Sequence, residues 1–146
     1  MNTNPATPPC VCTTIRKADR AIHRPYEAAL QDAEVSIVQF ALLRALQRNG
    51  DMRLPDLAAD QWMDRTSLYR TMAPLVDHGA IQLQRAPTGN TKVATLTPRG
   101  ERLIERTLPL WAQAQATVVS RIGQQHWQAL AEEILNLPDV LALDDA

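Results

Sequence analysis

The sequence has little that would mark an enzyme or a membrane protein. It has only five glycines, no phosphate-cradling glycine loop, and no motif that places a nucleophile beside a base. Its three histidines, His23, His78 and His126, lack the spacing of metal ligands. No apolar run reaches membrane-spanning length and no basic-then-apolar leader is present. We therefore expect a cytoplasmic protein that is not an enzyme and that needs no cofactor, metal or membrane.

Aromatic residues are also scarce, at 4% of a chain of 146 residues that is 45% hydrophobic. Aliphatic side chains must therefore build most of one ordinary core. Residues 1–9 are mostly Asn, Thr, Ala and Pro without periodicity, which predicts a flexible tail. We expect residues 10–146 to form a single domain.

No excess of one charge sign is present. Fifteen basic residues stand against sixteen acidic ones, for a net charge of −1. Nucleic-acid-binding proteins are often strongly basic, so any DNA affinity here must come from the arrangement of charges, and modest non-specific affinity is expected.

The most informative segment is residues 54–97. A short helix is predicted over 54–60, and a second one begins at the N-cap Asp64, buries an apolar stripe and ends at Gly79. Two strands, 81–85 and 92–96, then flank a turn at 87–90. Helix, helix and hairpin in this order predict a winged helix-turn-helix, the DNA-binding module of the chain.

The second of these helices has an exposed face that mixes guanidinium, hydroxyl and methyl groups, the chemistry that reads base edges and phosphates in a major groove. A solvated face is the alternative, but the hairpin that follows favours a recognition helix. The residues expected to bind DNA are Arg65, Thr66, Ser67, Arg70 and Thr71 from the helix, and Arg85, Asn90 and Lys92 from the hairpin. Pro74 predicts a bend in the helix.

Helices are predicted on both sides of this module. One covers residues 12–30, a second begins with a capping box at Ser36 and ends near Gly50, a third covers 97–123, and a last one ends at Pro138. The first and last helices are apolar on more than one side. Such an excess of apolar surface requires a partner.

The order of these segments resembles the MarR family of transcriptional regulators over nearly the whole chain. The matching segments are Gln39-Phe40-Ala41-Leu42-Leu43, the Leu57-Ala58 helix, Asp64-Arg65-Thr66-Ser67-Leu68 with Leu75 and Gly79, and Leu96-Thr97-Pro98-Arg99-Gly100. The resemblance implies an all-α fold with a small β-hairpin wing and a homodimer joined through residues 10–33 and 97–137. It also implies binding to pseudo-palindromic double-stranded DNA, as a repressor that small molecules or oxidants release.

The wing departs from the family pattern. The family usually has Asp and Arg shortly before the Leu-Thr-Pro segment, where this chain has Thr88 and Asn90. Arg85 or Lys92 then has to contact phosphate instead. A competing hypothesis is a winged-helix protein-interaction module that has lost DNA binding.

Two further sets of residues are candidates for sensing. Cys10 and Cys12 lie at the start of the first helix, where the helix dipole and nearby basic residues lower a thiol pKa. We hypothesise that Cys12 is oxidised to a sulfenic acid and captured by Cys10; a free tail thiol with a packed Cys12, or a zinc site with His23 that lacks a fourth ligand, are the alternatives. Four aromatic residues could line an effector pocket or pack in the core: Tyr26, Phe40, Trp62 and Trp111.

Overall fold

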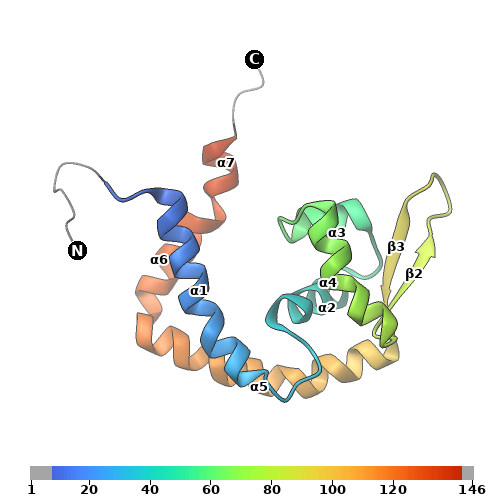
Figure 1. The fold of residues 1–146 in the computed structure, drawn as a ribbon, viewed down its shortest axis with the longest axis horizontal. Helices are drawn as coiled ribbons and strands as arrows, with labels where there is room; N and C mark the ends of the chain where they lie inside the picture. Colours follow the sequence, from blue (N-terminus) through green and yellow to red (C-terminus); the bar gives the residue numbers. More distant parts are fainter. Residues whose placement is uncertain (1–7, 143–146) are drawn as a thin grey trace.

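The structure is a computed structural model that describes residues 8–142, so residues 1–7 of the predicted tail lie outside it. Figure 1 shows two groups of elements joined by the long helix α5 (Pro98–Ile122). One group contains the two short helices of the winged module, the helix before them and the sheet; the other contains the terminal helices. Among the described helices, none is both long and apolar enough to cross a membrane.

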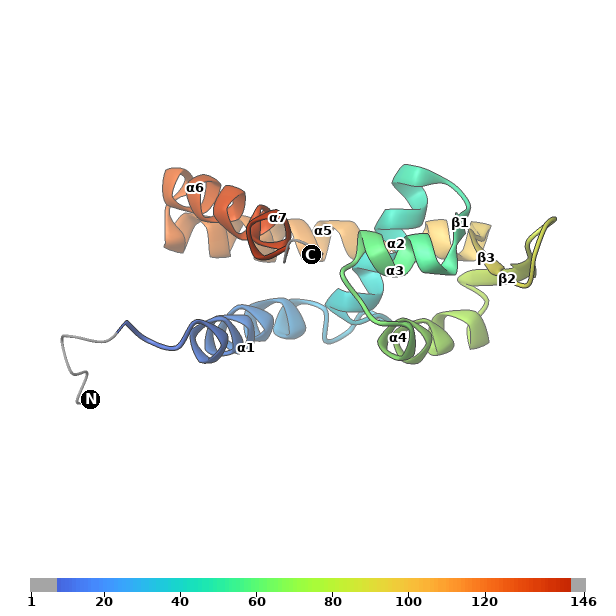
Figure 2. The same ribbon diagram turned by 90° about the horizontal axis from the view of Figure 1, so that it is seen from above.

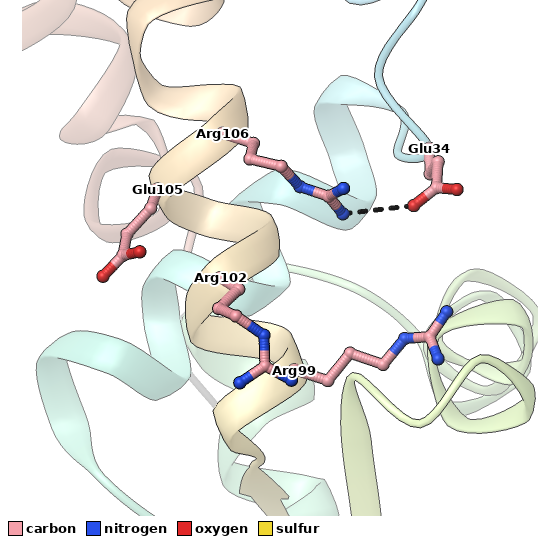
Figure 3. A pocket seen from close by; sticks show the side chains of 5 residues that line it. All are labelled: Glu34, Arg99, Arg102, Glu105 and Arg106. Atoms are coloured by element: carbon pink, nitrogen blue, oxygen red, sulfur yellow. Dashed lines mark hydrogen bonds and ion pairs between the residues drawn. The ribbon is translucent and has the colours of Figure 1, made fainter.

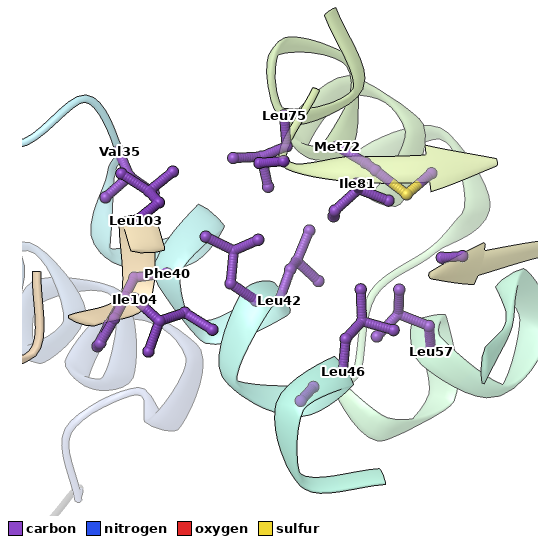
Figure 4. Packing of buried hydrophobic residues seen from close by; sticks show 14 of the residues in the cluster. Val35, Phe40, Leu42, Leu46, Leu57, Met72, Leu75, Ile81, Leu103 and Ile104 are labelled. Carbon is purple, nitrogen blue, oxygen red and sulfur yellow. The ribbon is translucent and has the colours of Figure 1, made fainter. Parts of the chain in front are cut away.

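Helix α2 (Ile37–Asn49) forms the centre of the core. The Ser36 hydroxyl accepts the Gln39 amide at 3.2 Å and the Gln39 side chain accepts the Ser36 amide at 2.9 Å, which confirms the predicted capping box. Leu42 and Leu43 are 0% exposed. Figure 4 shows side chains of α2 between those of α5 on one side and those of the winged module on the other.

The helix-turn-helix consists of α3 (Leu54–Asp60) and α4 (Arg65–Asp77), as predicted. Pro55 occupies the first turn of α3, where its missing N–H costs nothing. Helix α4 continues through Pro74 to the predicted stop. Leu57 of α3 and Leu68 of α4 are at most 1% exposed, so both helices are held by the core around α2.

The wing is an antiparallel sheet of three strands in the order β1-β3-β2. Strands β2 (Ile81–Arg85) and β3 (Lys92–Leu96) form the predicted hairpin. Strand β1 (Met52–Arg53) was not predicted, because two residues cannot show an alternating pattern. Its residue Arg53 pairs with Val93, which ties the start of the helix-turn-helix to the wing.

The start of α5 is packed against the end of the winged module. The Thr97 hydroxyl accepts the Gly100 amide at 3.1 Å and lies 3.1 Å from the Ala80 carbonyl oxygen, to which it donates. A Cβ at Gly100 would collide with that carbonyl oxygen and lie 2.6 Å from the Leu96 side chain. Only glycine allows this close approach, which fixes the direction of α5 relative to α4 and the sheet.

The other end of α5 contacts α1 (Val11–Ala29) and α6 (Gln124–Leu135). The Tyr26 hydroxyl donates a hydrogen bond to the Gln115 side chain, and Tyr26 is the only residue of α1 that is buried. The prediction that the last helix ends at Pro138 is wrong. Helix α6 ends at Leu135, and Pro138 lies in the first turn of α7 (Leu137–Leu141), where proline needs no N–H.

The terminal helices bury few of their apolar side chains. No residue of α6 is buried, and Val11 and Leu135 are 69% and 66% exposed. Ile15 of α1 and Leu130 of α6 are 45% and 42% exposed. In Figure 2, α1 lies apart from α6 and α7 instead of packing with them. These helices therefore present apolar faces that residues 8–142 do not cover.

Candidate nucleic-acid interface

The exposed face of α4 begins at its N-terminus. Asp64 caps the helix by accepting the Ser67 amide at 2.8 Å. Arg65, Thr66 and Arg70 are exposed, and the Arg65 guanidinium lies 5.6 Å from the centre of the Tyr69 ring. This cation–π contact holds the Arg65 guanidinium beside the first turn, while Arg70 has no hydrogen bond or ion pair to another described side chain.

Two of the predicted DNA-binding side chains are engaged within the helix. The Ser67 hydroxyl donates to the Asp64 carboxylate, and the Thr71 hydroxyl donates to the Ser67 carbonyl oxygen, both at 2.8 Å. Both residues are half-buried. The amide and hydroxyl of Ser67 also hold the pKa of the Asp64 carboxyl below its usual range. Arg65, Thr66 and Arg70 are therefore the side chains of this set best placed to meet a ligand.

A groove of about 380 Å³ lies between α3, the N-terminal half of α4 and β3. Its lining residues are Leu54, Pro55, Ala58, Arg65, Leu68, Tyr69, Asn90, Thr91 and Lys92. Its lining is mostly apolar and includes two cations, Arg65 and Lys92. The structure thus brings Arg65, Asn90 and Lys92 together, although the first and last are far apart in the sequence.

The wing contains one cation that sequence reasoning missed. Arg53 of β1 donates to the Thr88 hydroxyl at 3.3 Å, near the tip of the hairpin. Because β1 was not predicted, nothing in the sequence pointed from Arg53 to the wing. Arg85 donates a hydrogen bond to the Asn90 side chain at 2.7 Å. These two predicted DNA-binding residues are therefore bonded to each other across the hairpin.

Cys10 and Cys12 are both free and exposed at the start of α1. The amide and hydroxyl of Thr13 hold the pKa of the Cys10 thiol below its usual range. The zinc hypothesis is wrong: the described residues contain no cluster of three ligands, and His23 instead lies 3.1 Å from the Asp19 carboxylate.

The four aromatic residues do not form one pocket in the structure. Phe40 and Trp111 pack with ring centres 6.2 Å apart and belong to the core region. Tyr26 is buried between α1 and α5, and burial raises its pKa. Trp62 lies in the turn between α3 and α4 and is 58% exposed, so it does not join the other three.

A second hollow lies where α5 passes the loop between α1 and α2. Figure 3 shows Arg106 directed to Glu34, with 3.2 Å between the guanidinium nitrogen and the carboxylate oxygen, and Arg99 directed toward α4. Arg102 and Glu105 complete the lining of about 440 Å³. The side chains diverge and both members of the ion pair are two-thirds exposed, as on a solvated surface.

Comparison with solved structures identifies the fold. The transcriptional regulator MosR of Mycobacterium tuberculosis, solved in complex with DNA, is 27% identical to this chain with a TM-score of 0.81, and the alignment covers 90% of this chain and 95% of MosR. Sco3205 of Streptomyces coelicolor, a MarR-family regulator solved with DNA, is 22% identical with a TM-score of 0.79 over 93% of this chain and 88% of Sco3205. The chain has the winged-helix fold of MarR-family transcriptional regulators.

Other neighbours have the same fold. BpsR of Bordetella bronchiseptica is 20% identical with a TM-score of 0.79, and the alignment covers 90% of this chain and 94% of BpsR. No protein-family model matches the sequence. No curated protein matches it either. The solved structures that this chain resembles are transcriptional regulators, a class of proteins that is not enzymatic.

Proposed function

We propose that this chain, with its MarR-like winged-helix fold, is a DNA-binding transcriptional regulator. The observation that carries the proposal is the groove that Arg65 of α4 and Lys92 of the wing line together, with Arg70 exposed on the same helix. A recognition helix and a wing can then contact base edges and phosphates of one duplex together. Solved DNA complexes of MosR and Sco3205 support this. Such a regulator would work in the cytoplasm.

The proposed active form is a homodimer. Helices α1 and α6 carry partly exposed apolar side chains, among them Ile15, Ile22 and Leu130, that a second copy of the chain would bury. Two recognition helices related by a two-fold axis read two half-sites, so the operator should be pseudo-palindromic. The module of residues 54–97 would read the DNA, and residues 10–33 and 97–137 would set its spacing.

The direct test is binding of the purified protein to the DNA upstream of its own coding sequence, followed by fluorescence anisotropy at several salt concentrations. We expect saturable binding that weakens as salt rises and that exceeds binding to an unrelated duplex of equal length. Footprinting of the same DNA should reveal a site with two-fold symmetry. No difference between the two duplexes would favour the alternative, a winged-helix interaction module that has lost DNA binding.

Within this proposal the regulator is a repressor. A dimer that occupies operator DNA in a promoter excludes the transcription machinery by sterics alone and needs no further contact. A reporter gene behind the footprinted promoter should be less active when the protein is present, and Arg70→Ala should restore it. Higher reporter activity in the presence of the wild type would instead indicate an activator.

The proposed signal is an oxidant that acts on the two cysteines, and we now propose Cys10 in place of Cys12 as the residue that reacts first. Because the Cys10 thiol has the lowered pKa, we assign it the attack on peroxide, which reduces the peroxide and leaves a sulfenic acid. The Cys12 thiol then attacks that sulfur, water leaves and a disulfide forms. Both thiols are exposed, so peroxide can reach them.

The effect of peroxide on DNA affinity tests this proposed signal. Peroxide should lower the affinity of the wild type for the promoter duplex, dithiothreitol should restore it, and Cys10→Ser should stay bound under peroxide. Mass spectrometry should find the intramolecular disulfide. Unchanged binding by the oxidised wild type would point to a small-molecule effector, such as the 6-hydroxynicotinic acid that regulates DNA binding by BpsR.

A further inference from the structure

Trp62 is an unusual residue for the turn that it occupies. It lies between α3 and α4 with a φ of +51°, and among the described residues every other positive φ belongs to a glycine. Its side chain is 58% exposed. The left-handed conformation is costly for a bulky side chain, and glycine or asparagine would make the same turn without that cost.

Neither folding nor packing explains a tryptophan at this position. The turn is closed by main-chain hydrogen bonds, from the Trp62 amide to the Ala59 carbonyl oxygen at 3.1 Å and from the Met63 amide to the Ala58 carbonyl oxygen at 2.8 Å. These bonds do not use the indole. An exposed indole also forfeits most of the stabilisation that burial would give. A strained and exposed aromatic side chain therefore points to a functional role.

The position of Trp62 indicates what it meets. It precedes Asp64, the N-cap of α4, by two residues, and Arg65 and Thr66 follow in the exposed first turn. A recognition helix enters the major groove with its N-terminal residues, so the turn before it lies against the backbone that borders the groove. The closed turn gives the indole a rigid support on that side.

We propose, resting on the proposed DNA-binding function, that Trp62 contacts DNA. Its ring packs against the deoxyribose of the strand beside α4, and its Nε1–H donates to a phosphate oxygen. An indole offers an apolar face and one donor at its edge, which matches a sugar next to a phosphate. Contacts to sugar and phosphate position the helix in the groove without reading the sequence.

The first test compares the wild type, Trp62→Gly and Trp62→Phe on the promoter duplex and on an unrelated duplex. Glycine removes both the ring and the conformational cost, so Trp62→Gly should keep or raise the melting temperature while its affinity for both duplexes falls about tenfold. Trp62→Phe should have intermediate affinity, because its ring packs but cannot donate. Equal affinities for all three proteins would overturn the proposal.

A second test uses the fluorescence of the indole. Promoter DNA should shield the wild type from quenching by acrylamide, and Trp62→Phe, which keeps the half-buried Trp111 and Trp127, should show no shielding. Binding without any shielding in the wild type would also overturn the proposal. Failure of the wild type to bind either duplex would refute the proposed function itself, which separates the two claims.

Discussion

The winged module and the terminal helices differ in how they are stabilised. Around α2, the side chains of Leu42, Leu43 and Leu57 are 0% exposed, so this part has a complete core within one chain. Helices α6 and α7 bury no residue, and α1 buries only Tyr26. The winged part thus buries its core within one chain, whereas the terminal helices leave apolar faces that we propose as one half of a dimer interface. In the proposed function, this difference separates the part that would read DNA from the part that would set the distance between two recognition helices.

The largest effect is expected from removing half of that interface. Truncation after Gly123 deletes α6 and α7 and exposes the side of α5 that α6 contacts. We expect the truncated chain to aggregate or to lose its folded structure, because the remaining apolar surface cannot be covered. Light scattering and circular dichroism measure this. A soluble, folded monomer at micromolar concentration would show that the helices need no second chain to cover their apolar side chains.

A matched pair of substitutions sharpens the same comparison. Leu57→Ala and Leu130→Ala remove the same atoms, but Leu57 is fully buried and Leu130 is 42% exposed. Leu57→Ala should lower the free energy of unfolding by about 2–5 kcal/mol at every protein concentration. Leu130→Ala should instead weaken association, so that its effect on stability depends on concentration. Denaturant unfolding at two concentrations distinguishes the two cases, and equal behaviour of both variants would contradict the division.

Within the winged module, the recognition helix and the wing should differ. Arg70→Ala should weaken specific binding by about 1–3 kcal/mol if its guanidinium reads a guanine. Lys92→Ala should cost less and affect all sequences alike, because a phosphate contact carries no sequence information. Anisotropy titrations with the promoter duplex and an unrelated duplex measure the loss of affinity in each variant. Unchanged promoter affinity in both variants would remove α4 and the wing from the interface.

The smallest effect concerns the cap of α4. The pKa of Asp64 is lowered in the folded chain, chiefly by the Ser67 amide. Its ionised form therefore stabilises the fold above the pKa of an unfolded aspartate, and this contribution is lost as pH falls through the folded pKa. Asp64→Asn, which keeps a capping oxygen, should lose this acid dependence. Melting temperatures of both proteins between neutral and acid pH measure it, and parallel curves would contradict the assignment.

The sequence predicted three helices well because the start of each has a local cause. Ser36, Asp64 and Thr97 cap their helices with their own side chains, and each begins a helix that carries an apolar stripe. Such signals extend over a few residues and need no knowledge of the rest of the fold. They were sufficient to predict α2, α4 and α5.

Features that depend on distant partners were not predictable in this way. Strand β1 exists because Met52 and Arg53 pair with β3, about forty residues later. Ser67 and Thr71 have the composition of DNA contacts, but their hydroxyls bond within α4, which only the coordinates reveal. The separation of Trp62 from Phe40 and Trp111 is likewise a tertiary property.

The central claim is that two copies of this chain, joined by α1, α5 and α6, bind one duplex through their α4 helices. Sedimentation equilibrium of the full chain, alone and mixed with the promoter duplex, tests it most directly. The account predicts a dimer mass for the free protein and a complex of two chains per duplex. A monomer that binds the duplex one to one would contradict it.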